Sequence, residues 1–202
     1  FTKVKGRLEP EPLQPTFFVP MVGQAEDERT KPAEPGELAI VNGDFQGVSG
    51  DQPVAWYYVR QGRVEASGRS PGGKCLTFRN ETPGRAAQAL QAVGVDGRKV
   101  QEIEISLWVR GRALQAGTPP HQRPGMTVVC FNANRHPVLN QGMGPWSGTF
   151  DWVKKSLRIK VPAAARLASI DIGLWGGTGQ LSVSDVTLRV IASREESESR
   201  VQ

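Results

Sequence analysis

The last third of the chain, from Trp152 to Val190, limits the fold most, because apolar residues recur there at every second position. Val161-Pro162-Ala163 and Gly176-Gly177-Thr178-Gly179 are turn sequences that divide this stretch into three runs. Successive side chains of a β-strand point to opposite faces, so each run would bury one face and leave the other outside. Antiparallel strands of this kind, joined by short turns, predict half of a β-sandwich.

Similar short runs continue back to residue 38, and they predict an all-β domain with an antiparallel β-sandwich. The predicted strands are Leu38–Phe45, Ala55–Val59, Val64–Ala66, Lys74–Arg79, Ala86–Val93, Gln101–Arg110, Met126–Asn132, Lys155–Val161, Ser169–Trp175 and Leu181–Ile191.

Composition divides the chain into three parts. Residues 1–37 are rich in proline and charge and predict an extended arm or linker, residues 38–192 form the predicted sandwich, and residues 193–202 form a charged tail. Within the arm, Phe17 and Phe18 lie in an apolar cluster between prolines. Two interpretations stay open, a segment that docks on the sandwich or on a partner protein, and a linker with an incidental apolar patch.

The charge pattern argues against a specific nucleic-acid partner. The net charge is +5, but the arginines are scattered and form no dense run. Such a pattern predicts a solvated basic surface, which an anionic polysaccharide would also suit. No apolar run approaches the roughly 20 residues that a membrane-spanning helix needs.

The two cysteines, Cys75 and Cys130, both fall in predicted strands. A disulfide and a pair of buried thiols are equally compatible with these positions. With two cysteines and two histidines in the chain, a Cys/His metal site is not expected.

Alternation places several polar and aromatic side chains on the outer faces of two strands. Glu104, Trp108 and Arg110 alternate with apolar residues in one strand, and Asp171 and Trp175 do so in another. An exposed indole can stack on the apolar face of a sugar ring, while nearby charged groups bind its hydroxyls. The sequence therefore predicts a ligand-binding face here. An indole that is instead packed under another part of the chain or under a partner protein fits the pattern equally well.

A further aromatic residue, Trp146, lies in the loop Gly144-Pro145-Trp146-Ser147-Gly148. We expect it to form the edge of a binding cleft.

Several short motifs resemble those of carbohydrate-binding modules of families four, nine and twenty-two. They are Asn42-Gly43-Asp44-Phe45 with a tryptophan some ten residues later, Gly73-Lys74-Cys75-Leu76-Thr77-Phe78, Ile105-Ser106-Leu107-Trp108-Val109-Arg110, Phe150-Asp151-Trp152, and Gly179-Gln180-Leu181-Ser182-Val183-Ser184-Asp185-Val186-Thr187-Leu188. The resemblance covers residues 38–191, in matching order.

The resemblance implies a galactose-binding-like jelly roll that binds a polysaccharide or oligosaccharide without catalysis. It also implies a single cleft on the concave sheet, holding both Trp108 and Trp175, and a secreted, periplasmic or cell-surface location. Such modules commonly hold one structural calcium ion between the first and last strands. Its implied ligands here are Asp44 or the Gln46 position, the neighbourhood of Lys74, and Asp185, but the sequence lacks one acid at Gln46 and one at Ser184. The alternative is that Asp44 and Asp185 cap turns.

Two other functions are compatible with the sequence. An assembly subunit would use the sandwich as a scaffold and the arm, through Phe17 and Phe18, as a tether to partner proteins. A glycosidase would need two carboxyl groups about 5–10 Å apart, for which Glu104 and Asp171 are the candidates. We expect no enzyme, since acids on a sugar-binding face usually accept hydrogen bonds from hydroxyl groups.

Overall fold

The computed structural model describes residues 2–4, 7–9, 38–67 and 73–194. The chain divides into two units, Phe1–Thr30 and Lys31–Gln202. In the first unit, β1 (Thr2–Val4) pairs with β2 (Arg7–Glu9) as an antiparallel hairpin, so this part of the predicted arm contains strands. Phe17 and Phe18 lie outside the described residues.

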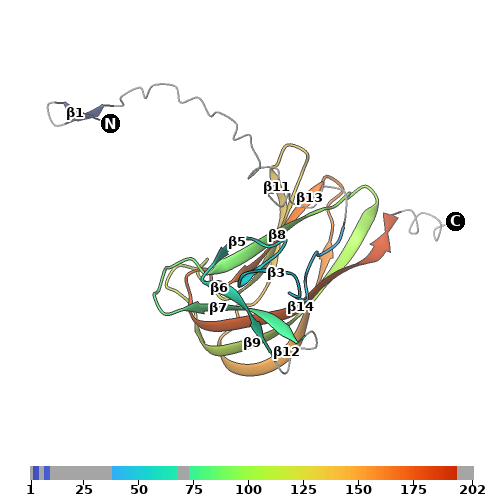
Figure 1. Ribbon diagram of the computed structural model, residues 1–202. Helices are drawn as coiled ribbons and strands as arrows, with labels where there is room; N and C mark the ends of the chain where they lie inside the picture. The colour runs from blue at the N-terminus through green and yellow to red at the C-terminus, as the bar shows by residue number, and fades with distance from the viewer. Residues whose placement is uncertain (1, 5–6, 10–37, 68–72, 195–202) are drawn as a thin grey trace, which may run out of the picture. The chain divides into compact units, whose positions relative to one another are not determined.

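The second unit contains two five-stranded antiparallel sheets that face one another (Figure 1). The first sheet has the order β11-β10-β13-β8-β5, and its strands are β5 (Tyr57–Arg60), β8 (Gln88–Gly94), β10 (Gly125–Phe131), β11 (Pro137–Met143) and β13 (Leu167–Gly173).

The second sheet has the order β12-β9-β14-β7-β6. Its strands are β6 (Gly62–Ala66), β7 (Lys74–Asn80), β9 (Val100–Gln115), β12 (Gly148–Lys160) and β14 (Thr178–Ser193), and a short hairpin of β3 (Val48–Ser49) and β4 (Gln52–Pro53) precedes it in the chain.

The core lies between the sheets and uses the predicted inward faces. On β9 the inward residues are Ile103, Ile105, Leu107 and Val109, all fully buried, and the alternation in β13 buries Ile170 and its neighbours in the same way. Burying one such side chain stabilises the fold by about 1.5–3 kcal/mol. The predicted antiparallel β-sandwich is confirmed, and its fold is a jelly roll.

The predicted strand Leu38–Phe45 is wrong, because this segment is an irregular turn. Asn42 and Phe45 have left-handed backbone angles, with φ of 53° and 58°. The Asn42 amide bonds to the backbone of Gly47 and Val54, at 2.8 Å in each case. A side chain that makes hydrogen bonds to backbone groups in this way competes with strand pairing. The apolar residues around Asn42 are therefore held in place without the hydrogen bonds of a β-sheet.

Strand β11 was not expected from the sequence. It is an edge strand whose residues are all exposed or half-buried, so it lacks the alternation that burial of one face produces.

Both cysteines are free and buried, which decides for thiols over a disulfide. Cys130 faces the core between the sheets, whereas Cys75 contacts the Thr77 hydroxyl at 3.4 Å. Burial raises the pKa of both thiols, to about 11 for Cys130. Among the described residues, no helix is long and apolar enough to span a membrane.

Candidate functional site

A cleft of about 520 Å³ opens on the outer face of the first sheet. Three strands and three loops line it: β10 with Thr127 and Val129, β11 with Asn140 and Gly142, β13 with Asp171, the loop around His121 and Arg123, the loop at Gly144 and Pro145, and the turn at Trp175. It therefore combines an aromatic ring with charged and amide groups at its walls.

The floor of the cleft is part of a continuous row of residues across the first sheet. In register, Gly142 pairs with Thr127, Thr127 with Asp171, Asp171 with Leu90, and Leu90 with Tyr57. Side chains at directly paired positions lie on the same face of a sheet. The row thus extends from the cleft past its polar floor to an apolar and aromatic end on β5.

Asp171 is the half-buried carboxylate at the centre of this row. The Ser169 hydroxyl lies 3.1 and 3.0 Å from its two oxygens and donates to the carboxylate. Burial raises the pKa of Asp171, and the Ser169 hydrogen bond offsets part of that shift. A carboxylate with so little protein support has acceptor capacity left for the hydroxyl groups of a ligand.

Trp175 lies in the turn two residues after the end of β13 and is held in a left-handed conformation, with φ of 53°. Hydrogen bonds on both sides fix this turn: the Leu174 N–H donates to the Ala87 carbonyl at 2.7 Å, and the Gly84 N–H donates to the Gly176 carbonyl at 2.8 Å. A non-glycine residue in this region costs energy and persists only where its surroundings hold it. The indole therefore lines the cleft from a well-defined backbone.

The structure brings together two of the six predicted ligand residues, Asp171 and Trp175. Glu104, Trp108 and Arg110 lie on β9, in the second sheet, and their side chains alternate with its core residues. The two sheets pack face to face, so their outer faces point in opposite directions. The expectation that Trp108 and Trp175 share one cleft is therefore wrong.

Trp146 is also placed differently from the prediction. Its side chain is 7% exposed and belongs to the core, although its loop borders the cleft at Gly144 and Pro145. The Trp146 N–H donates to the Pro124 carbonyl at 2.8 Å. The residue thus anchors the cleft wall from inside rather than forming its edge.

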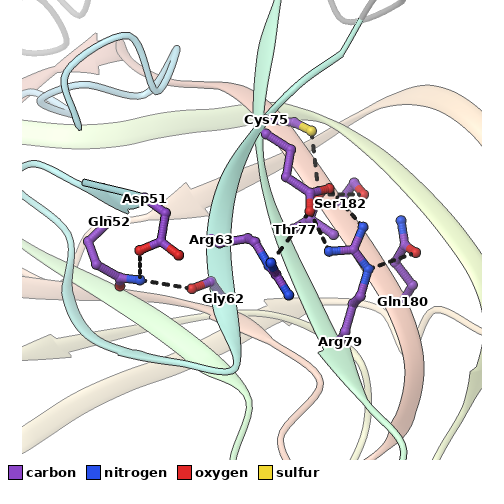
Figure 2. A network of polar contacts seen from close by, with 10 residues as sticks. Asp51, Gln52, Gly62, Arg63, Cys75, Thr77, Arg79, Gln180 and Ser182 are labelled. Atoms are coloured by element: carbon purple, nitrogen blue, oxygen red, sulfur yellow. Dashed lines mark hydrogen bonds and ion pairs between the residues drawn. The ribbon is translucent and has the colours of Figure 1, made fainter. Parts of the chain in front are cut away.

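The outer face of the second sheet is a network of polar side chains that bind one another. Figure 2 shows Cys75, Thr77 and Ser182 on neighbouring strands, with the two hydroxyls 3.0 Å apart. Arg79 lies in the same view and bonds to Gln180 and, at 2.8 Å, to Glu65. These hydrogen bonds hold the pKa of Glu65 below its usual value, chiefly through Arg79.

Glu104, on the same outer face, also accepts hydrogen bonds from arginine side chains. Arg189 and Arg158 bond to its two oxygens at 2.8 and 3.2 Å and lower its pKa. Six residues farther along β9, the Arg110 guanidinium lies 4.9 Å from the centre of the Trp152 ring. Because Glu104 and Asp171 lie on opposite outer faces, they cannot act as a glycosidase pair on one bond.

The residues implied for calcium lie near one another. The Val186 N–H, next to Asp185, donates to the Gly43 carbonyl at 2.9 Å, and the Lys74 ammonium lies 3.2 Å from the Gln46 carbonyl. Within the described ranges, no three His, Cys, Asp or Glu side chains gather closely enough to hold a metal ion.

Sequence reasoning missed several residues of the cleft. Thr127 and Asn140 are single polar residues on β10 and β11, and His121 and Arg123 lie in a proline-bounded loop. The outward position of Thr127 between inward Met126 and Val128 could have been found by alternation. The others depend on β11 and on a loop path that local patterns do not predict.

No protein-family model matches the chain, and no curated protein matches it. Among solved structures, the enzymatically active domain of tailspike protein 4 of bacteriophage CBA120 is similar, with a TM-score of 0.59 and 15% identity over 75% of this chain and 21% of the tailspike chain. The chain thus spans about a fifth of that protein's length. A CBM4 structure has a TM-score of 0.47 and 19% identity, over 75% of this chain and 99% of its own.

The CBM22-1 xylan-binding domain of Paenibacillus barcinonensis Xyn10C has a TM-score of 0.42 and 16% identity, over 68% of this chain and 86% of its own. At such identities the tailspike similarity shows a shared fold and no more.

Proposed function

We propose that this chain is a non-catalytic carbohydrate-binding module whose cleft on the first sheet holds a polysaccharide. The observation that carries the proposal is the cleft that joins the Trp175 indole to the half-buried Asp171 carboxylate. An indole binds the apolar face of a sugar, and a carboxylate accepts from its hydroxyl groups. The family motifs in the sequence support the same function, and they support an extracellular, periplasmic or cell-surface location.

The composition of the cleft supports binding without hydrolysis. Among the described residues that line it, Asp171 is the one carboxylate. Glycoside hydrolysis ordinarily needs two carboxyl groups on either side of the scissile bond. A single carboxylate that accepts a hydrogen bond from Ser169 can orient a sugar. The described cleft holds no second acid to protonate the leaving group of a glycosidic bond.

The experiment compares Trp175→Ala with Trp108→Ala, its matched control on the opposite sheet. Affinity electrophoresis and calorimetry would use soluble xylan, mixed-linkage β-glucan and a uronate-rich polysaccharide. Loss of one stacked ring costs about 1–3 kcal/mol, so Trp175→Ala should weaken binding by about 5- to 150-fold. Trp108→Ala should bind as the parent does.

Thermal unfolding of both variants checks that each is folded. The proposal fails if the parent protein is retained by no polysaccharide on a broad glycan array. It also fails if Trp108→Ala loses binding and Trp175→Ala keeps it.

A further inference from the structure

A lysine ammonium occupies the place where the first turn of the sandwich meets β7 and β14. The Lys74 Nζ donates to the Gln46 carbonyl at 3.2 Å, bridging β7 to the turn. The Val186 N–H donates to the Gly43 carbonyl at 2.9 Å and bridges β14 to the same turn. The backbones approach so closely that a Cβ on Gly43 would lie 1.9 Å from the Val186 oxygen.

The backbone oxygens at this junction already have donors from the chain itself. The Ser184 hydroxyl donates to the Lys74 carbonyl at 2.8 Å. The Lys74 ammonium donates to the Gln46 carbonyl, and the Val186 N–H donates to the Gly43 carbonyl. Calcium requires six to eight oxygens at about 2.3–2.6 Å. An ion that bound here would have to displace these donors and sit against an ammonium of like charge, which is unfavourable at such short range.

The side chains at the junction fit calcium no better. Asp44 Oδ1 accepts from the Gln46 N–H at 3.3 Å, and Asp185 Oδ2 lies 2.9 Å from the Ser184 hydroxyl. Asp185 itself is held at φ of 49°, in the bulge between the parts of β14 that pair with β9. Among the described residues no third acidic side chain joins these two, which leaves the donor set short of what calcium needs, so the residues do not fit the ion that the motifs imply.

We propose that the side-chain ammonium of Lys74 takes the place of a structural calcium ion in this chain. The ammonium supplies a positive charge at the Gln46 carbonyl, and the Lys74 carbonyl accepts a hydrogen bond from the Ser184 hydroxyl. The turn, β7 and β14 are therefore joined by the chain alone, and the fold and the cleft need no divalent metal.

The test measures thermal unfolding of the full chain in about 1 mM calcium chloride and in excess chelator. The melting temperature of the parent protein should differ by less than about 1 °C between the two, whereas an ion bound at 100 times its Kd would raise it by about 5–10 °C. Lys74→Met keeps the apolar stem and removes the charge, and it should melt about 3–6 °C below the parent.

The matched control is Lys154→Met, which removes the same charge from an exposed lysine of β12 that has no ion-pair partner in the described part of the chain. It should melt as the parent does. A calcium-dependent rise of about 5 °C or more in the parent, or stoichiometric calcium binding by calorimetry, overturns the proposal. Equal melting of the two variants does so as well. If Lys74→Met does not fold, the calcium titration of the parent decides alone.

Discussion

Gln91 offers the sharpest test of how the irregular first segment is held to the sandwich. It occupies an inward position on β8, between Ala89 and Val93, and is 2% exposed. Its amide makes three hydrogen bonds to backbone: Oε1 accepts from the Val41 N–H at 2.8 Å, and Nε2 donates to the carbonyls of Val41 and Ala55, both at 2.9 Å. One side chain thus ties two loop segments to the first sheet.

Gln91→Met keeps the volume of the side chain and removes all three hydrogen bonds. Each contributes about 0.5–1.5 kcal/mol, so the free energy of unfolding should fall by about 2–4 kcal/mol. In a domain of this size that corresponds to a fall in melting temperature of about 4–16 °C. Chemical denaturation with a constant m-value would give the free energy directly.

The control is Gln88→Met, on the outward face of the same strand, where the effect should stay within about 0.5 kcal/mol. Equal stability of the two variants would refute the reasoning, because it would mean that water replaces the Gln91 amide at no cost.

Three further predictions concern ionisation, close backbone contact and the thiols. Burial raises the folded pKa of Asp171, so its ionisation costs stability; the cost is absent below its unfolded pKa of about 4 and is complete once pH exceeds the folded pKa. Asp171→Asn should therefore melt higher than the parent at neutral pH and flatten the profile of melting temperature against pH, and a lower melting temperature there would contradict this. Gly43→Ala should lower the melting temperature by about 5 °C or more, because its Cβ would meet the Val186 oxygen, and an unchanged value would exclude that contact. Cys75 and Cys130 should resist iodoacetamide at about pH 8 until the protein is unfolded, when mass spectrometry should count two alkyl groups without prior reduction.

Local alternation predicted the strands whose two faces differ most in burial. In β9, Ile103 and Ile105 alternate with half-exposed residues, and the pattern gives both the strand and its inward face. It fails at Gln91, which is polar yet inward, because its partners are backbone groups distant in the sequence. It fails again at β11, where neither face is buried, so apolar and polar residues have no reason to alternate.

The same limit explains the candidate site. Alternation assigned Trp108 and Trp175 to outer faces but could not say which sheet each strand would join, since that depends on pairing between distant segments. Asp171 and Trp175 were predicted together because β13 and the turn that follows it carry both to the cleft. Trp146 was misassigned because the glycines and prolines around it indicate a loop but say nothing about where the indole points.

The positions of β13 and β14 in their sheets have a consequence for synthesis of the chain. Each is the central strand of its sheet, and among the strands that the structure describes they are the last two in the sequence. Until residues 167–193 have left the ribosome, β8 and β10 have no common neighbour, nor have β7 and β9, and their unpaired edges are open to wrong partners. Such distant pairing makes folding slow, so we expect the domain to be completed only after β13 and β14 have both emerged.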